Sequence, residues 1–582
     1  MIVLEDRRRL LLTLSLGLLQ LLLLSTQQAV GFVPLPTTIP CSANSRSPVG
    51  STRVSTGSSL AAVSEDKQQQ QGPLENMQVA IAGAGPTGLL LAHLLLQKGA
   101  RVALYESRAD PRRIAASTSS SKSGFAYALG LGIRGRSAIR AVDESLWQAV
   151  RQKGNECDRF RLHIGPFRVQ LRAGNTNKKR TFFRRRRNNN NPKQQPEPSL
   201  LLFQTDLCGS LLEELEQRYS SSSQLQMFFS SRILECDLAK QRITIDRNKN
   251  VTIVQAYDLL VGCDGVNSIV RSAMKKATDT AFTADKQTLP GEFKVARLES
   301  IPPKLDPTSV ALLIPKTGTT TAFLEPTIEG SCCILFAGRE GDAILSSPTI
   351  STSTEQTSSN NKTRALAETI AASFPLLEGA DLDHVADQLL AQKPGSASSV
   401  TCNTYHYRSS VALAGDAAHA TGGVSGQGVN SALLDAVALR DCLLEYYTTS
   451  SSQNRNDQAL QSALEAYSKR QVPEGKALYD LSFGPKPRGL KKLLFLAKGF
   501  RDTVFQGRWG IGKPPLQTLL TTSMEPFSSI RRRMDYYYDT PFPDDDYFDS
   551  AISSVYDDAS NTNSNNEAEK TNATERPPQV RQ

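Results

Sequence analysis

A glycine-rich turn between apolar stretches is the first feature whose spacing could support chemistry. Gly83, Gly85 and Gly88 follow the apolar run 79–82 and open a helix predicted over 89–97. Gly83 permits a tight turn, Gly85 lets the backbone approach a pyrophosphate, and Gly88 lets the helix pack closely on the strand. The free N–H groups and the positive dipole end of the helix then face a bound anion.

An acidic residue after the next strand completes this pattern. A second strand is predicted over 101–105, and Glu106 follows it, 23 residues after Gly83. A carboxylate at about this separation binds ribose hydroxyls in dinucleotide-binding units. A glycine triplet alone is weak evidence, but the triplet with both strands, the helix and the acid predicts a dinucleotide site.

Two further apolar strands each lead to an aspartate in a tight turn. The runs 257–262 and 411–414 lead into Asp264–Gly265 and Gly415–Asp416. Ligands of open α/β sheets bind at the carboxyl ends of the strands, where these carboxylates would lie. Read alone, Asp264 could equally mark an ordinary strand end.

A second glycine-rich turn follows the last of these strands. Gly426, Gly428 and Val429 lead into a helix predicted to begin at about Asn430. The positive end of that helix would again point into the site and could stabilise negative charge there. His419 lies between the strand and this turn and is assigned no chemistry, since an isolated histidine is more often structural.

Together these segments resemble the FAD-dependent aromatic hydroxylases, which have the para-hydroxybenzoate hydroxylase fold. The resemblance covers about residues 77–485 apart from loop insertions, and it is strongest to the kynurenine 3-monooxygenase group through 128–136, 261–265 and 415–420. It implies a mixed α/β fold. A Rossmann-like FAD-binding domain would carry an interleaved β-sheet substrate domain and a helical C-terminal region.

The resemblance also implies the contents of the site. FAD would be the cofactor, NAD(P)H the co-substrate that reduces it, and O2 the source of one oxygen atom for an electron-rich small molecule. Asp416 would bind ribityl hydroxyls. No catalytic side chain and no metal are expected, because the flavin carries the chemistry. The expected flavin contacts are Gly83, Gly85, Gly88, Glu106, Gln204, Asp264, Gly265, Gly415, Asp416, Gly426, Gly428, Val429 and Asn430.

Three positions depart from the kynurenine 3-monooxygenase pattern, and all three are assigned to the substrate pocket. Phe125 stands where those enzymes have an Arg that holds the substrate carboxylate, Leu434 replaces a Glu, and Gly423 replaces a Pro. Burying the charges of an amino acid without partners would cost on the order of several kcal/mol. We therefore expect a substrate that carries less charge than kynurenine.

Three other functions are compatible with these motifs, because one fold can serve several chemistries. They are a flavin reductase or desaturase of the geranylgeranyl reductase type, a carotenoid epoxidase, and a flavin-binding protein without catalytic activity. Oxygen uptake with NAD(P)H separates an enzyme from a scaffold. Oxygen in the product separates a monooxygenase from a reductase.

The first 76 residues are expected to direct the chain rather than to fold with it. Arg7–Arg9 precede an apolar run at 10–24, which is typical of a secretory signal. Residues 31–64 contain no acidic side chain, as in transit peptides. With Phe32 near the junction, the segment resembles the bipartite plastid presequence of algae with secondary plastids. The alternative is the endoplasmic reticulum, or anchoring by an uncleaved run at 10–24.

The rest of the chain is expected to be one FAD-binding monooxygenase domain over 77–485 and a C-terminal region. Low-complexity stretches at 173–199 and 346–362 are interpreted as loop insertions. A helical extension is expected over 486–543. The acidic, Asn-rich tail over 544–582 is expected to be disordered.

The stretch 489–501 combines leucines with lysines and could touch a membrane surface. A helix packed on the catalytic body would explain the same pattern. No motif for nucleic acid accompanies the net charge of +10, so no nucleic-acid partner is expected. Nine scattered cysteines without C-x-x-C or Cys/His spacing argue against a disulfide framework and against zinc.

Overall fold

The computed structural model describes most of the chain between residues 72 and 555. Phe125, residues 1–71 of the targeting segment, most of the insertion at 173–199 and the chain beyond 555 lie outside the described residues. Residues 72–76, also placed in that segment, are described, and Leu74 is buried in the main core, so this part of the segment folds with the body. The described ranges are 72–112, 127–172, 197–247, 251–278, 281–346, 356–447, 457–485, 487, 489–495, 497 and 516–555.

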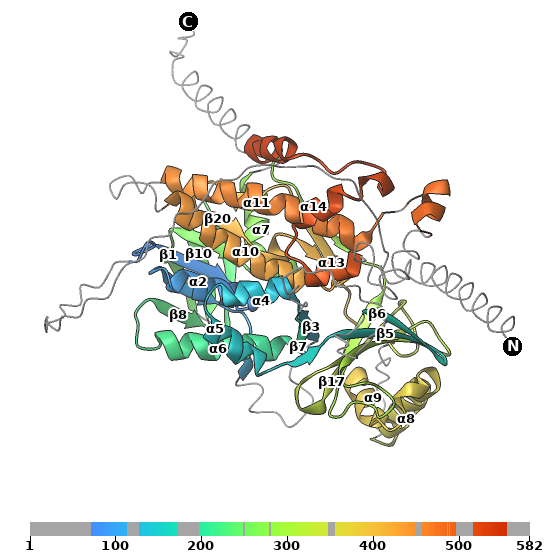
Figure 1. Cartoon of the computed structure of the whole chain (residues 1–582). Helices are drawn as coiled ribbons and strands as arrows, with labels where there is room; N and C mark the ends of the chain where they lie inside the picture. The colour runs from blue at the N-terminus through green and yellow to red at the C-terminus, as the bar shows by residue number, and fades with distance from the viewer. Residues whose placement is uncertain are drawn as a thin grey trace, which may run out of the picture.

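A largely parallel sheet forms the centre of the larger domain (Figure 1). Its order is β19–β20–β12–β1–β2–β8, and only β19 and β20 pair antiparallel. Its central strands are nearly continuous apolar runs, as expected where both faces of a sheet are covered. The bounds are β1 Gln78–Ala82, β2 Arg101–Tyr105, β8 Leu225–Phe228, β12 Leu259–Gly262, β19 His406–Tyr407 and β20 Val411–Leu413.

Helix α2 (Pro86–Leu96) packs against β1 and β2, and two later helices cover it. These are α6 (Gln204–Tyr219) and α10 (Gly428–Cys442), which both contact α2. Ten of the 11 residues of α2 are buried, and a helix that is apolar all round belongs in an interior. The main domain also contains α4 (Ile133–Arg140), α5 (Glu144–Arg151), α7 (Ile269–Ala277) and α11 (Asp457–Phe483).

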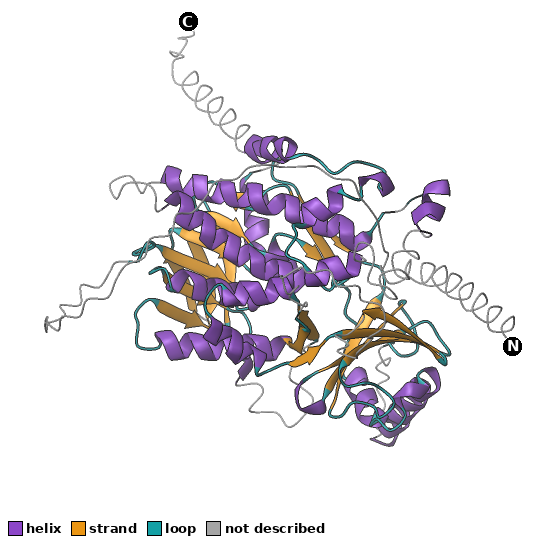
Figure 2. Cartoon of the chain, viewed as in Figure 1, coloured by secondary structure: helices purple, strands orange, loops and turns teal. Residues whose placement is uncertain are grey.

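The interleaved domain is built on a second six-stranded sheet, seen at the lower right of Figure 2. One face of this sheet packs on α8 (Gln356–Ser373) and α9 (Leu382–Leu390) through a separate apolar core. The strand order is β14 Glu292–Leu298, β17 Cys332–Gly338, β16 Thr321–Pro326, β15 Ser309–Ile314, β5 Arg159–Ile164 and β6 Phe167–Arg172.

Three small sheets accompany the two larger ones. The sheet β3–β7–β4 lies between the two larger ones and carries the chain from the nucleotide-binding side to the substrate domain. The bounds are β3 Ala128–Leu131, β4 Asn155–Cys157, β7 Ser199–Phe203, β9 Ser231–Asp237, β10 Arg242–Arg247, β11 Val251–Ala256, β13 Ala284–Thr288, β18 Ser398–Cys402 and β21 Ala420–Thr421. The predicted mixed α/β architecture with an interleaved β-sheet domain is confirmed.

The C-terminal region returns to the main domain through a buried arginine. Arg134 donates hydrogen bonds to the carbonyl oxygens of Leu520 and Glu525, and its guanidinium stacks 4.2 Å from the centre of the Phe527 ring. The helices held in this way are α13 (Leu516–Thr522) and α14 (Phe527–Arg532).

Two sequence interpretations need correction. Residues 356–362, placed in a loop insertion, form the first turns of α8. Residues 545–555, placed in a disordered tail, form a helix whose Phe548, Ile552 and Val555 are buried in the main core. The composition of the whole tail is acidic, but apolar residues spaced by three and four give this segment one buried face.

Two further observations concern cysteines and membrane spans. All eight described cysteines are buried, and no disulfide joins two of them. Across the described ranges, the structure has no helix that is both long enough and apolar enough to span a membrane.

Deletion of residues 545–582 should destabilise the protein, whereas deletion of 556–582 alone should not. Each apolar side chain that is fully buried contributes about 1.5–3 kcal/mol, so losing three should cost roughly 4 kcal/mol or more. Thermal denaturation of the two truncated proteins beside the parent measures this. Equal melting temperatures for both truncations would contradict the placement of this helix.

Candidate active site

Three carboxylates gather at the carboxyl edge of the central sheet. Glu106 follows β2, Asp264 lies two residues after β12, and Asp416 lies three residues after β20. Because β20, β12, β1 and β2 are consecutive parallel neighbours, their carboxyl ends share one edge. The structure therefore brings together acids separated by hundreds of residues in the sequence, at the edge where open α/β sheets bind ligands.

The first glycine-rich turn is constrained by close backbone approaches. Gly83 has a φ of +99°, and a Cβ there would lie 2.5 Å from the carbonyl oxygen of Cys263. A Cβ on Gly88 would lie 2.1 Å from the Gly83 carbonyl oxygen. Both glycines are therefore required by packing of the turn on β12 and on its own helix.

Gly85 differs from its neighbours because protein packing does not require a glycine there. A Cβ on Gly85 would have no protein atom within 4 Å, and the residue stands at the N-cap of α2 without a side-chain cap. Open space in front of uncapped helix N–H groups is the arrangement that a pyrophosphate needs. The free space at Gly85 is thus on the ligand side of the turn.

Glu106 ties β2 to the glycine-rich turn. One carboxylate oxygen accepts a hydrogen bond of 3.0 Å from the Ala84 N–H, and the other accepts 2.8 and 2.9 Å bonds from the Arg108 backbone and side chain. Burial raises the pKa of Glu106, but the hydrogen bonds and charge of Arg108 outweigh it, so the pKa is lowered. Glu106 is therefore an anion at neutral pH. No sequence motif marks Arg108, whose part in the site follows from its contact with Glu106.

Asp416 projects from a buried turn. Its side chain is exposed, whereas Gly415, Ala417 and Ala418 around it are buried. The carboxyl nevertheless lies deep in the protein, so burial raises its pKa, and the nearby His419 opposes that shift. An exposed carboxylate on buried backbone is available to accept hydrogen bonds from ligand hydroxyls.

His419 and Asp435 form a buried pair beneath this turn. The Asp435 carboxylate accepts a 2.7 Å hydrogen bond from His419 Nε2 and a 2.8 Å bond from the Gly415 N–H. Burial lowers the pKa of His419, but Asp435 outweighs it and the net pKa is raised. The Tyr405 ring stacks on the imidazole at 5.6 Å. His419 is thus a positioning residue. Its role depends on the contact with Asp435, which the sequence alone does not show.

The second glycine-rich turn is held to the first domain by Asn430. Its Oδ1 accepts hydrogen bonds from the Gly132 and Gly135 N–H groups at 2.8 and 3.2 Å. Its Nδ2 donates to the carbonyl oxygens of Gly130 and Gly426 at 2.9 and 3.4 Å. An amide offers four such bonds, so this side chain has none left for a cofactor. The Asn430 side chain therefore has a structural role, and the contact of this residue with the cofactor stays a prediction.

The glycines of this turn face open space. A Cβ on Gly426 or Gly428 would meet no protein atom within 4 Å, and Gly426 has a φ of +64°. Val429 is partly buried in the first turn of α10. As at Gly85, the uncapped end of a helix and the space before it are available to a ligand.

The remaining expected contacts lie on the same side. Gln204 opens α6, and its backbone N–H donates a 3.1 Å hydrogen bond to the Tyr127 carbonyl oxygen. Asp264 accepts a 2.7 Å bond from the Ile269 N–H through one oxygen, and its buried second oxygen has no protein partner. Gly265 follows with a φ of +76° and open space around it.

Two of the three expected pocket residues are described. Leu434 lies on α10, four residues after Asn430, and packs partly buried against the main core. Gly423 is exposed with a φ of +79°, which a proline cannot adopt. The replacement of proline at this position therefore changes the path of the backbone. Phe125 lies outside the described residues.

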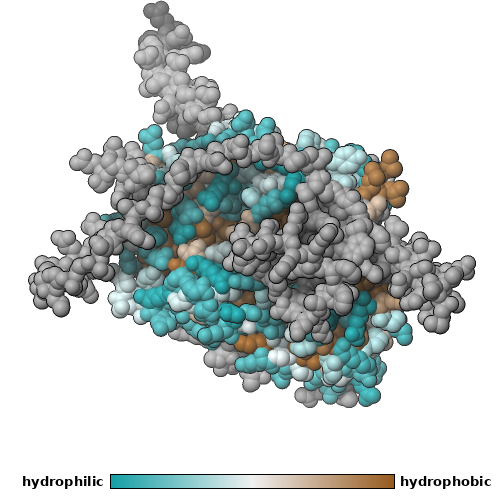
Figure 3. Space-filling view, in the orientation of Figure 1, coloured by the Kyte–Doolittle hydropathy of each residue, from teal (hydrophilic) through white to brown (hydrophobic). Residues whose placement is uncertain are grey.

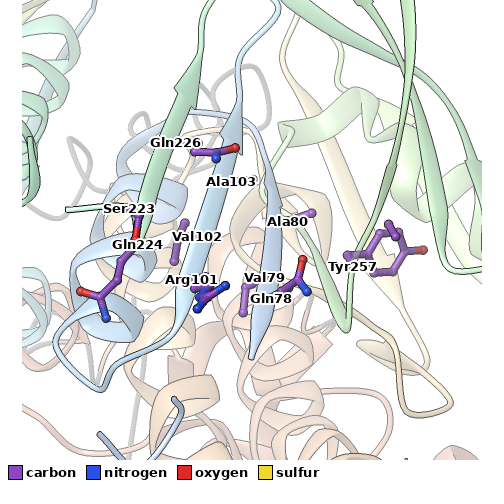
Figure 4. Close-up of a pocket in the computed structure, with 11 residues that line it drawn as sticks. Gln78, Val79, Ala80, Arg101, Val102, Ala103, Ser223, Gln224, Gln226 and Tyr257 are labelled. Atoms are coloured by element: carbon purple, nitrogen blue, oxygen red, sulfur yellow. The ribbon is translucent and has the colours of Figure 1, made fainter. Parts of the chain in front are cut away.

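A separate hollow on the sheet does not belong to this site (Figure 4). It is lined by the first halves of β1 and β2, together with Gln224, Gln226 and Tyr257. The carboxylates stand at the opposite ends of these strands. Its position therefore separates it from the predicted ligand contacts.

Comparison with known proteins agrees with this geometry. Residues 76–482 match the FAD binding domain family. The chain is 27% identical over 478 residues to kynurenine 3-monooxygenase of Stenotrophomonas maltophilia, covering 79% of this chain and 90% of that protein. It is 25% identical over 489 residues to kynurenine 3-monooxygenase of Caenorhabditis briggsae, covering 78% and 93%.

A solved structure gives the same fold. The tetrameric form of 2-methyl-3-hydroxypyridine-5-carboxylic acid oxygenase superposes with a TM-score of 0.51 at 18% identity, covering 80% of this chain and 99% of that chain. Sheet, site and similarities together define a flavoprotein monooxygenase with the aromatic-hydroxylase fold. The chain belongs to the FAD binding domain family and is an FAD-dependent monooxygenase with NAD(P)H as co-substrate.

The residues present fit FAD. Gly85 and the N-terminus of α2 would hold the pyrophosphate, Glu106 the ribose, and Asp416 the ribityl chain. When bound, FAD supplies the redox and oxygen-transfer chemistry. The protein would hold the cofactor in position and direct the positive ends of α2 and α10 toward it, at a site surrounded by buried residues. The reductase, epoxidase and non-catalytic alternatives are not favoured by these similarities.

Gly85→Val should yield a folded protein without FAD. The branched side chain would fill space that no protein atom occupies, so folding should survive while the pyrophosphate is excluded. Absorbance of the flavin per protein molecule measures binding. Gly209→Val on α6 is the matched control, because a Cβ there also has room. Full flavin content in the Gly85 variant would contradict this assignment.

His419 should make the stability of the protein depend on pH. The pKa of His419 is raised in the folded state, so its protonation stabilises the fold. This stabilisation is fully present below the ordinary pKa of histidine, about 6.5. It is lost as the pH rises through the raised pKa of the folded protein. His419→Gln should lower the free energy of unfolding by roughly 3–5 kcal/mol near pH 6. The difference between parent and variant should become smaller as the pH is raised toward 9. Denaturation of both proteins across this range measures it. A difference independent of pH would refute the charged pair.

Proposed function

We propose that this monooxygenase transfers one oxygen atom to an aromatic or similarly electron-rich molecule that is kynurenine-like in shape but less charged. Leu434 carries this proposal, since it stands as an apolar residue where the kynurenine 3-monooxygenase pattern has a Glu. An amino-acid substrate would bring two charges, which cost several kcal/mol (order of magnitude) when buried without partners. Phenolic, isoprenoid or quinone-like compounds fit better.

The face of the substrate-domain sheet opposite α8 and α9 supports the same choice. It presents Phe293, Val295, Phe323 and Leu335, which follow the alternation of strands β14, β16 and β17. A wall of such side chains excludes water from the reacting groups. The N-terminus of α10 would stabilise negative charge on the reduced cofactor.

The test compares kynurenine with 2′-aminoacetophenone, which keeps an aminophenyl ketone but lacks the charged amino-acid end. The uncharged compound should stimulate NAD(P)H oxidation and O2 uptake at least about tenfold more than kynurenine. Peroxide is measured in parallel to detect oxidation that is not coupled to product. Strong, coupled stimulation by kynurenine would defeat the proposal, and oxygen-18 in the product would establish the monooxygenase reaction on the compound used.

We also propose that the helix at 489–495 lies on an anionic membrane surface. Leu490, Leu493 and Leu494 are 71, 63 and 44% exposed, whereas Phe495 is 2% exposed and packs its ring 5.3 Å from Tyr537. The apolar patch at the upper right of Figure 3 lies where Figure 1 places this helix. Leucines beside Lys491 and Lys492 suit an interface that is apolar inside and negatively charged at its surface.

Flotation with vesicles of phosphatidylcholine and phosphatidylserine tests this surface, with protein lacking residues 1–71. Binding should occur at low salt and fall in Leu490→Glu/Leu493→Glu, because charge at these positions opposes insertion. Leu234→Glu is the control, since that leucine is 46% exposed elsewhere. Equal loss in both variants, or no binding at low salt, would favour a helix that simply packs on the body.

A further inference from the structure

A polar row crosses the substrate-domain sheet on the face opposite α8 and α9. Arg297 of β14 pairs with Cys333 of β17, which pairs with Glu325 of β16. Neighbouring Ala322 and Leu324 of β16 point the other way, into the core formed with α8 and α9. Side chains of a strand alternate between faces, so Glu325 shares its face with Phe323.

This row lies against the strands that lead to the flavin side. The Ala128 N–H donates to Cys333 Sγ at 3.4 Å, and the Arg297 guanidinium lies 4.8 Å from the centre of the Phe203 ring. Beyond them, Gly130 of β3 binds Asn430 of the second glycine-rich turn. Gln204, which follows Phe203, opens α6. The row is therefore a short distance along two strands from the expected flavin contacts.

Glu325 has no partner for its carboxyl. The described residues provide it with neither a hydrogen bond nor an ion pair, although it lies deep in the protein. Its side chain nevertheless keeps some accessible surface. A deep group that keeps accessible surface is not fully enclosed by the described side chains, and a polar group without a partner there is costly to keep.

Burial raises the pKa of Glu325 to about 8. The carboxyl is therefore mostly protonated at neutral pH and can donate a hydrogen bond. Along this face, the adjacent described strands bring two other charged or titratable groups. The Cys333 thiol stays neutral because burial raises its pKa, and the Arg297 guanidinium lies over the Phe203 ring.

We propose that Glu325 determines specificity in the substrate pocket by donating a hydrogen bond from its carboxylic acid to a carbonyl oxygen of an uncharged aromatic substrate. This inference rests on the proposed function and names the polar group that selects the substrate. An apolar wall with one inward donor favours ligands that carry a matching acceptor and rejects analogues without it.

The experiment titrates oxidised holoprotein with 2′-aminoacetophenone and with 2-ethylaniline, which lacks the carbonyl, and follows the visible spectrum of the flavin. The parent should bind the ketone about tenfold more tightly, the value of one buried hydrogen bond. Glu325→Leu should lose this preference, and Glu325→Gln should keep most of it. Glu299→Leu, at an exposed carboxylate just after β14, should leave it unchanged.

The pH dependence separates this role from a structural one. Between pH 6.5 and 9.5 the parent should lose its preference for the ketone as the carboxyl ionises, whereas Glu325→Gln should show no such loss. Equal preference in the parent and the Leu variant, or a preference that does not change with pH in the parent, would overturn the proposal. Flavin content and melting temperature report whether each variant folds.

The titration needs no turnover, so its failure is distinct from that of the proposed function. If ketone binding depends on Glu325 but no O2 uptake occurs, the role of Glu325 in the pocket is supported and the proposed reaction is contradicted. If coupled turnover is unaffected by Glu325→Leu, the proposed reaction is supported and the role of Glu325 is contradicted.

Discussion

Close approach of backbone to backbone at the edge of the central sheet is the constraint on which the site depends. The turn after β1 touches the turn after β12 at Gly83, and the helix that follows touches the first turn again at Gly88. A Cβ on Gly415 would lie 2.8 Å from Thr87 Oγ1, so the turn after β20 meets the same helix start. Three turns from distant parts of the chain share one small volume. Glycine is the residue that permits this, and the cofactor takes the space that remains.

A buried charge network supports that contact from below. Asp435 lies on α10 and binds both His419 and the N–H of Gly415, so the helix that begins at the second glycine-rich turn also fixes the turn carrying Asp416. A Cβ on Gly475 of α11 would lie 2.1 Å from the Tyr405 hydroxyl and 3.0 Å from the His419 ring. Helix α11 therefore presses on the flavin side, although none of its residues carries a flavin motif. Removing one member of such a pair leaves the other charge buried without a partner, so substitution of either residue is destabilising.

The sequence predicted the parts of this arrangement that are local. Glycine spacing, the apolar runs and the acids after them follow directly from the chemistry of one turn, and the structure places all of them at one edge. The sequence could not show that the Asn430 amide forms hydrogen bonds with the backbone of β3 and of the start of α4, because these partners lie almost 300 residues earlier. It also could not assign His419, since the reason for its burial is on another helix. Residues 545–555 were misjudged because average composition hid three apolar residues with helical spacing. Glu325 carried no motif, and its isolation becomes visible only when three strands pair.

The main apolar core contains Leu74 near its beginning and Val555 near its end. During synthesis this core cannot be completed until residue 555 has been made, because the helix at 545–555 contributes buried residues to it. The second core draws only on residues 296–389, so it can form earlier and by itself. A nascent chain would thus carry a finished substrate domain on an unfinished nucleotide-binding body. That order leaves apolar surface of the body uncovered until residues 545–555 can pack on it.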